Sequence, residues 1–256
     1  LRPWLLTAVV AFFFAIAAAA PLAVIAPAYA LPETLQTGTP QVVFRDVERG
    51  RVGLLDARVL TPEVRPEDYV EIELDWQIDA PLARDWSLFV HLVTEDGVIV
   101  SQRDIYPGGG TLATSDLAAG YAWRNPLAIW VPPAAYAPSL LDVRVGWYLL
   151  PSGERLIRAD GEEMITVGQV ALEPRPALDG AADVPNPIRI NFDRQIELAG
   201  YALSSLSAEP GASLELTLYW RGLAPIANDY IVFAHIIEPM TMSIYAGSDA
   251  APAGWG

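Results

Sequence analysis

The two histidines of the chain, His91 and His235, are the side chains best suited to acid–base or ligand-binding chemistry. Each stands two residues after a phenylalanine, and each is followed, 13 or 14 residues later, by an aspartate, Asp104 or Asp249. Such an imidazole either binds a ligand or uses a ring nitrogen to satisfy a neighbouring backbone group or carboxylate. We expect the second role, because repeated domains reuse a packing solution.

Acidic residues are the candidates for metal chemistry. Asp104 and Asp249 each precede a proline by three residues, which predicts turns in which the carboxylate accepts backbone N–H bonds. A calcium site needs about six to eight oxygen ligands, and the carboxylates here are scattered. A stripe at Glu71, Glu73 and Asp75 alternates with apolar residues, so we expect it to be the solvated face of a sheet. The sequence therefore predicts no metal site.

Eight tryptophans and ten tyrosines raise the possibility of sugar binding, because aromatic faces pack on pyranose rings. Trp76, Trp147 and Trp220 fall on the apolar faces of predicted strands, so we expect them in the core. The positions left open to a binding role are Trp86, Trp123, Trp130 and Tyr148. Together with the two histidines, Trp86 and Trp123 are the candidate binding residues.

Signatures of catalysis and of nucleic-acid binding are missing from the sequence. It has no G-x-S-x-G, no H-E-x-x-H and no cysteine, and Gly108–Gly110 lacks the strand–helix setting of a phosphate loop. We predict no catalytic residue and no cofactor. The chain has no lysine and a formal net charge of −15, which repels a phosphate backbone, so we expect no nucleic-acid partner.

The first thirty residues contain no charge after Arg2. The apolar run from Trp4 to Ala26 would be about 34 Å long as a helix, enough to cross a lipid bilayer, and Pro21 would kink or end it. We predict a transmembrane helix in residues 1–30, with the lipid bilayer as partner and the rest of the chain on the extracytoplasmic side of the cell membrane. A secretory signal cleaved at Ala28-Tyr29-Ala30 and a buried core helix are the alternatives.

Two stretches of the chain repeat each other at an offset of 144 residues. The pattern I/L-x-L-x-W occurs at 72–76 and 216–220, and F-x-H-L/I occurs at 89–92 and 233–236. After a one-residue insertion, D-x-x-P-x-G occurs at 104–109 and 249–254. Both histidines therefore fall on one equivalent position. The second copy stops before the region equivalent to 112–172, so we expect it to be incomplete and the natural chain to continue.

Apolar and polar residues alternate with a period of two, which predicts β-strands. The alternation is clearest at 70–78 and 141–149, and Asp96-Gly97 and Pro151–Glu154 supply turns, the latter leading into a strand at 155–158. Further strands are expected at 41–45, 53–60, 89–94, 98–102, 122–131 and 164–172. We predict a mainly β chain with tandem antiparallel, immunoglobulin-like sandwiches, divided into residues 1–30 (transmembrane helix), 38–172 (first sandwich), 173–185 (linker) and 186–256 (second, truncated sandwich).

These motifs, with Gly146-Trp147-Tyr148, Arg155-Leu156 and the stretch Pro21–Ala30, resemble the C-terminal part of large bacterial multi-span glycosyltransferases similar to dolichyl-phosphate-mannose protein mannosyltransferases. In that family a many-helix membrane domain transfers a sugar from a polyprenyl-phosphate donor, and some members end in tandem sandwiches outside the membrane. The resemblance implies a non-catalytic accessory region that orients an acceptor or glycan, with the polyprenyl-linked sugar handled by a membrane domain absent from this sequence. The family's catalytic carboxylate lies in an early loop, so no residue here inherits its role. The alternative is a membrane-anchored or secreted tandem-sandwich binding or spacer protein without an enzymatic partner domain.

Overall fold

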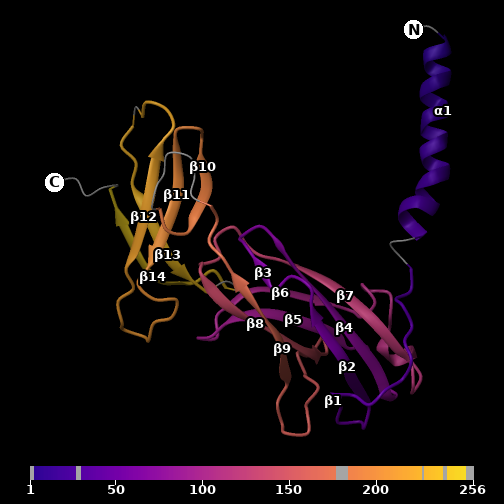
Figure 1. The fold of residues 1–256 in the computed structure, drawn as a ribbon. Helices are drawn as coiled ribbons and strands as arrows, with labels where there is room; N and C mark the ends of the chain where they lie inside the picture. Colours follow the sequence, from indigo (N-terminus) through magenta and orange to yellow (C-terminus); the bar gives the residue numbers. More distant parts are fainter. Residues whose placement is uncertain (1–2, 27–29, 177–183, 227, 239–240, 252–256) are drawn as a thin grey trace. The chain divides into compact units, whose positions relative to one another are not determined.

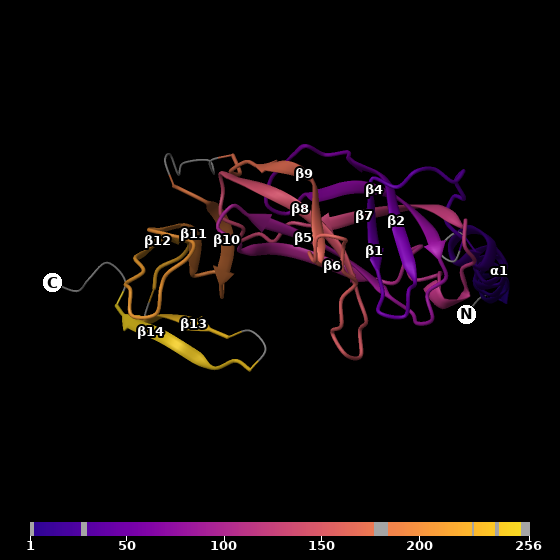
Figure 2. The same ribbon diagram turned by 90° about the horizontal axis from the view of Figure 1, so that it is seen from below.

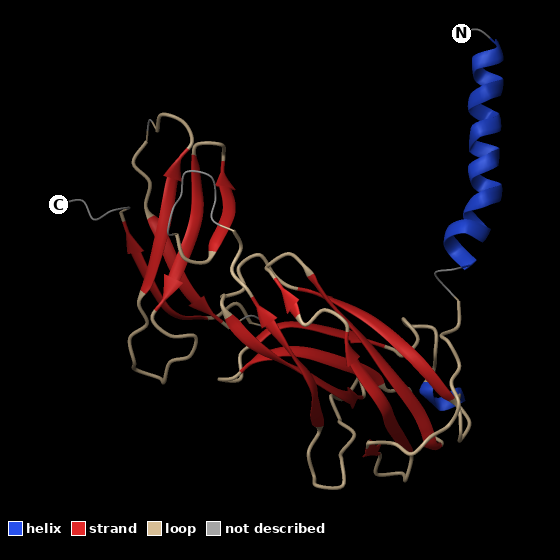
Figure 3. Ribbon diagram, viewed as in Figure 1, coloured by secondary structure: helices blue, strands red, loops and turns tan. Residues whose placement is uncertain are grey.

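The chain is mainly β, with one apolar N-terminal helix and several antiparallel sheets, in a computed structural model (Figures 1 and 3). The structure describes residues 3–26, 30–176, 184–226, 228–238 and 241–251. It separates the chain into two units, one formed mainly by residues 1–175 and the other mainly by residues 176–256. Part of the predicted linker and the end of the second D-x-x-P-x-G motif lie outside the described residues.

The N-terminal helix α1 (Pro3–Ala20) ends where the sequence predicts, immediately before Pro21. A π-helical turn, Pro21–Ile25, follows, and it is closed by the backbone N–H of Ala26 donating to the carbonyl of Pro21. The window Thr7–Val24 has a mean hydropathy of 2.3 and is not buried against the rest of the protein. The helix is therefore long and apolar enough for a membrane anchor or a signal sequence, and its exposure does not fit the alternative of a buried core helix.

Two antiparallel sheets make up the first unit. One has the strand order β1-β2-β4-β7 and the other the order β3-β9-β8-β5-β6, in which only β3 runs parallel to its neighbour. The first contains β1 (Val42–Arg45), β2 (Arg51–Val59), β4 (Tyr69–Ala80) and β7 (Ala122–Trp130). The second contains β3 (Glu63–Val64), β5 (Ser87–Thr94), β6 (Ile99–Ile105), β8 (Ser139–Tyr148) and β9 (Met164–Leu172). The predicted strand at 155–158 is reduced to two isolated bridges, Tyr148↔Arg155 and Arg45↔Ile157.

The inward residues of the two sheets form one core, as the alternation predicts. Trp76 of β4 and Trp147 of β8 are both fully buried and meet edge to face, with ring centroids 5.0 Å apart. Trp123 of β7 lies edge to face against Trp147 at 6.4 Å. This geometry puts the positive ring edges against the negative ring faces, so the three tryptophans join the sheets at the centre of the sandwich.

A segment before β1 is hydrogen-bonded across the polar face of the first sheet. The N–H of Leu35 donates to the carbonyl of Ala122, and the N–H of Arg124 donates to the carbonyl of Glu33, which extends the sheet beyond β7. The N–H of Gly38 then donates to Oε1 of Gln77 at 3.0 Å on β4. Residues 33–38 therefore belong to the sandwich, although no apolar alternation marks them in the sequence.

The structure corrects the expectation that the acidic face of β4 is fully solvated. Glu71 is exposed, but Asp75 is only 6% exposed. Both carboxylate oxygens of Asp75 accept bonds from Arg124, at 2.9 and 3.1 Å, and Arg58 adds a third contact at 3.3 Å. The face is therefore neutralised by arginines from the neighbouring strands β2 and β7, which sequence alternation along one strand cannot show.

The second unit repeats the first part of this topology. Its three-stranded sheet contains β10 (Pro187–Phe192), β11 (Ile196–Leu203) and β12 (Leu216–Gly222), and its hairpin contains β13 (Val232–Ile237) and β14 (Ile244–Ala250) (Figure 2). Irregularities of register recur at equivalent positions. Leu54 pairs with Trp76 just before the bulge of β2, and Leu198 pairs with Trp220 just before that of β11. The hairpins β5–β6 and β13–β14 break register at Leu92 and Ile236. These recurrences support the 144-residue repeat.

Candidate functional site

His91 lies in the middle of β5, on the face of the second sheet that points away from the core. Its Nε2 atom is 3.8 Å from Oδ1 of Asp104 on β6, a distance for an ion pair and too long for a hydrogen bond. The His91 ring packs against the ring of Phe89, with 4.8 Å between the ring centroids. The guanidinium of Arg155 stacks on the Phe89 ring, 4.8 Å from its centroid. Burial lowers the pKa of His91, Asp104 acts in the opposite direction, and Arg155 lowers it further. The imidazole is therefore held mostly neutral beside a carboxylate.

Asp104 lies within β6 and not in the turn that the proline spacing predicts. Its carboxylate faces both His91 and the hydroxyl of Tyr148, whose pKa is raised by burial and then by Asp104. The strand continues through Asp104 because Phe89 pairs with it in the β5–β6 ladder. The prediction of a backbone-capping turn is wrong for this residue.

The second copy reproduces this arrangement. Nε2 of His235 lies 3.6 Å from Oδ1 of Asp249, and its ring packs against Phe233 at 5.2 Å. The two side chains are more exposed than in the first copy, at 34% for the imidazole and 66% for the carboxylate. The His–Asp pair is thus a property of the repeated hairpin.

Trp86 and Trp123, the two tryptophan candidates, are both 0% exposed. Trp86 is fixed by a backbone bond to Oγ1 of Thr114 at 2.9 Å and by Arg84, whose guanidinium lies 4.9 Å from its ring centre. Trp123 belongs to the central tryptophan cluster. Neither ring presents a face to solvent, so neither can stack on a sugar in this structure. Alternation along β5 did not show that Trp86 is buried, because Trp86 precedes the first residue of that strand.

Acidic side chains do not gather into a metal site within the described part of the chain, where no cluster of three or more His, Asp or Glu residues has that geometry. Arg84 donates two bonds to Glu154, at 2.6 and 2.9 Å, and this pairing lowers the pKa of Glu154. Asp142 accepts from Gln169 and Arg144, and these bonds lower its pKa. The carboxylates with shifted pKa values are thus held by protein donors.

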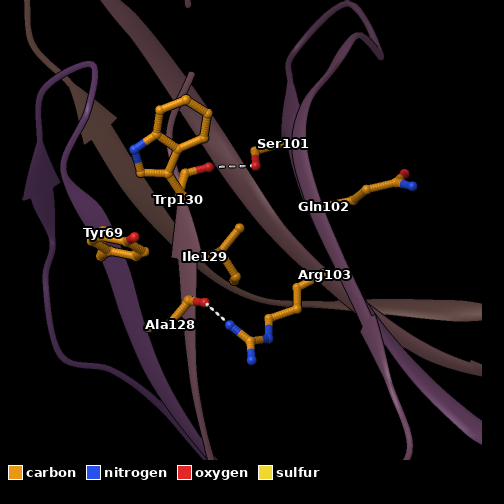
Figure 4. Close-up of a pocket in the computed structure, with 7 residues that line it drawn as sticks. All are labelled: Tyr69, Ser101, Gln102, Arg103, Ala128, Ile129 and Trp130. Carbon is orange, nitrogen blue, oxygen red and sulfur yellow. Dashed lines mark hydrogen bonds between the residues drawn. The ribbon is translucent and has the colours of Figure 1, made fainter. Parts of the chain in front are cut away.

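An open groove of about 340 Å³ lies where the edge strands β6 and β7 of the two sheets approach each other (Figure 4). Its volume is at the lower end of the usual range for small-ligand pockets. Two side chains of β6 cross to the backbone of β7: Oγ of Ser101 donates to the carbonyl of Trp130 at 2.6 Å, and Nη1 of Arg103 donates to the carbonyl of Ala128 at 2.9 Å. The residues lining the groove are Tyr69, Ser101, Gln102, Arg103, Ala128, Ile129 and Trp130.

These two bonds join the edges of the two sheets at the groove. Beyond the stretch paired with residues 33–35, β7 is a sheet edge, and its outward carbonyls need donors. Ser101 and Arg103 supply them from the other sheet, because they lie opposite Leu92 and Val90 and so project toward the first sheet. Gln102 lies between them and points away from the groove (Figure 4). The sandwich is thus closed on this side by polar side chains, without a further strand.

Two exposed aromatic rings border the same groove. Tyr69 and Trp130 are directly paired in the β4–β7 ladder and are 54% and 44% exposed. Directly paired residues share one face of a sheet, with Cβ atoms about 5 Å apart. Neither ring is needed for the core, since Val70 and Ile129, the next pair along the ladder, fill it. The sequence left Trp130 open to a binding role but gave no sign that Tyr69 would be its neighbour.

Comparison with known proteins identifies no relative that would assign a role. No family model and no curated protein matches the chain. Among solved structures, a β-glucuronidase from glycoside hydrolase family 2 is similar over 40% of this chain and 10% of its own, with 14% sequence identity and a TM-score of 0.28. A similarity at this level carries no argument about fold or function, and the chain spans only a small part of that protein.

Proposed function

We propose that this chain is a non-catalytic, membrane-anchored accessory region that binds glycan on the extracytoplasmic side, through the groove between β6 and β7. The observation that carries the proposal is the exposed Tyr69–Trp130 pair beside the hydrogen-bonding side chains of β6. Sugars are bound by aromatic faces that pack on their C–H surfaces and by polar groups that bond to their hydroxyls. Both kinds of group border the groove, and the groove is open enough to admit part of an oligosaccharide.

The N-terminal helix supports the membrane-proximal part of this proposal. Residues 7–24 are apolar and unburied, and Glu33, where hydrogen bonding to β7 begins, is only seven positions after Ala26 in the sequence. A fully extended segment of that length spans at most about 25 Å. If α1 crosses the bilayer, the edge of the first sandwich therefore stays within about that distance of the helix end. A glycan bound in the groove would be held close to the membrane.

The motifs described above favour a glycosyltransferase of the protein mannosyltransferase type as the enzyme that this region assists. In that arrangement the region would orient an acceptor or product glycan near a polyprenyl-linked donor, and the sugar transfer would occur in the membrane domain. The alternative remains an anchored or secreted spacer that works without an enzyme. The Ala28-Tyr29-Ala30 motif favours the secreted form, and N-terminal sequencing of the mature protein distinguishes a cleaved signal from an anchor.

Glycan binding is tested by calorimetric titration of the full chain, held in nanodiscs of neutral lipid, with a panel of bacterial-type oligosaccharides. We expect at least one oligosaccharide to bind, and we expect Trp130→Ala to weaken it by about tenfold, the effect of about 1.4 kcal/mol of lost stacking. Tyr245→Ala, an exposed tyrosine of the second unit, is the matched control and should leave the affinity unchanged. Binding that survives Trp130→Ala, or no binding across the panel, would contradict the proposal.

A further inference from the structure

We infer that the groove between β6 and β7 selects acidic sugars and that Arg103 is the residue that recognises their carboxylate. This inference rests on the proposed function and specifies its substrate class. A uronic acid residue carries one carboxylate on a pyranose ring, so it would match a guanidinium placed beside two aromatic rings. The groove offers this combination at Arg103, Tyr69 and Trp130.

Most arginines of the described chain are paired with acidic side chains. Carboxylates pair with nine of them, Arg58, Arg65, Arg84, Arg124, Arg144, Arg155, Arg158, Arg175 and Arg221. Arg103 is one of six described arginines without a carboxylate partner, the others being Arg45, Arg49, Arg51, Arg189 and Arg194. Of these six, Arg103 is the one that lines the groove, toward which its place on the inward side of β6 directs it.

The geometry of Arg103 leaves suitable donors for a carboxylate. Within the described structure, its one protein bond runs from Nη1 to the carbonyl of Ala128, which fixes the side chain in the groove (Figure 4). The Nε and Nη2 donors form the edge that binds a carboxylate through two parallel bonds, and no described residue occupies them. Because the bond to Ala128 already restricts the rotamers of the side chain, less conformational entropy is lost on binding.

Two acidic neighbours define how selective the site can be. Asp104 follows Arg103 but faces His91 on the opposite side of the strand. Glu71 pairs with Ala128 in the β4–β7 ladder and is exposed on the face that carries Tyr69 and Trp130, yet it forms no ion pair with Arg103 within the described structure. Glu71 would therefore repel a bound carboxylate weakly without neutralising the guanidinium. Its removal should strengthen the binding of an acidic sugar.

The experiment compares each uronate oligomer with its own neutral counterpart. The full chain in neutral-lipid nanodiscs is titrated with tetramers of galacturonate, glucuronate and mannuronate, and with the same tetramers after reduction of the carboxyl groups. We expect at least one uronate to bind about tenfold or more tightly than its reduced form. Arg103→Gln should abolish this preference, Arg103→Lys should retain part of it, and Glu71→Gln should increase it. Arg189→Gln, in β10 of the second unit, removes the same charge elsewhere and should have no effect.

The outcomes separate this inference from the proposed function. Reduced oligomers that bind as tightly as the uronates would overturn the role of Arg103 and leave glycan binding intact. A uronate preference that persists in Arg103→Gln would also overturn it. If no member of either series binds, both the inference and the proposed function fail. Should Arg103→Gln not fold, the Glu71→Gln variant decides: an unchanged uronate preference contradicts the inference.

Discussion

The imidazole of His91 and the carboxylate of Asp104 face each other across the β5–β6 hairpin, with 3.8 Å between Nε2 and Oδ1. The same pair recurs as His235 and Asp249 at 3.6 Å, each time beside a phenylalanine. Two hairpins that are 144 residues apart thus build one local arrangement. In the first copy the imidazole is buried whereas Asp104 is exposed, and the buried imidazole has consequences for the stability of the sandwich.

The first prediction concerns pH. Because burial lowers the pKa of His91 below its ordinary value of about 6.5, the unfolded chain takes up this proton at a higher pH than the folded chain does. His91 therefore makes stability fall as the pH drops below about 6.5, by at most about 1.4 kcal/mol per pH unit, until the folded protein is also protonated. Denaturant unfolding of wild type and His91→Gln at pH 7.5, 6.5 and 5.5 measures this slope.

The variant should lack that part of the slope, whereas the loss of stability that begins near the carboxylate range, at about pH 4, should persist in both proteins. Glu154 and Asp142 contribute there because protein donors lower their pKa values. Parallel curves between pH 7.5 and 5.5, or a wild type that gains stability relative to His91→Gln as the pH falls, would contradict the assignment.

The second prediction concerns Gly146, which pairs with Phe89. A Cβ at this position would lie 2.5 Å from the carbonyl oxygen of Glu163 and closer still to the ring of Phe89. Gly146→Ala should therefore destabilise the first unit by about 1–3 kcal/mol, because a buried ring and a strand backbone must both shift. Gly222→Ala is the control, since a Cβ there meets nothing within 4 Å. Equal denaturation midpoints for the two variants would show that the close packing is relieved at no cost.

The third prediction separates a core tryptophan from a surface one. Trp123→Ala should cost about 3–5 kcal/mol of unfolding free energy, because the ring is fully buried against Trp147. Trp130→Ala should cost less than about 1 kcal/mol, because its ring is 44% exposed. Chemical denaturation followed by far-ultraviolet circular dichroism gives both values. A large loss for Trp130→Ala would mean that this residue supports the fold, and its use as a binding platform would have to be abandoned.

The fourth prediction concerns the independence of the first unit. Residues 31–185 contain both sheets, the tryptophan core and the segment bonded across β4 and β7. We expect this fragment to unfold in one cooperative transition, with a midpoint within a few degrees of the corresponding transition in the full chain. Differential scanning calorimetry of the two proteins tests this. A fragment without a cooperative transition would show that the first sandwich depends on the rest of the chain.

Alternation was sufficient to predict most strands and the core of the first unit, because it depends only on residues close together in the sequence. The inward row of β4, from Val70 to Ile78, is buried as predicted, and the turn at Gly153 closes with φ +73. The burial of Asp75 could not be predicted in this way. It depends on Arg124, which lies on a neighbouring strand and 49 residues away in the sequence.

The groove was also beyond the reach of the sequence. Its walls come from Ser101 and Arg103 on one sheet and from β7 on the other, with separations of 29 and 25 residues for the two bonds. The tryptophans chosen as candidates, Trp86 and Trp123, are buried, whereas Trp130 is exposed because it ends its strand on the polar face. The exposure of an aromatic ring depends on which neighbouring segments cover it. Alternation along one strand shows only the face of the sheet on which the ring lies.

Fluorine NMR of the full chain labelled with 5-fluorotryptophan tests whether Trp130 contacts a bound glycan, because each of the eight tryptophans reports on its own surroundings. Each resonance is assigned by replacing one tryptophan with phenylalanine, and a glycan that binds is then titrated in. We expect the Trp130 resonance to shift in a saturable way while those of the buried Trp76, Trp123 and Trp147 stay in place. Saturable shifts confined to other tryptophans, with Trp130 unmoved, would contradict this expectation.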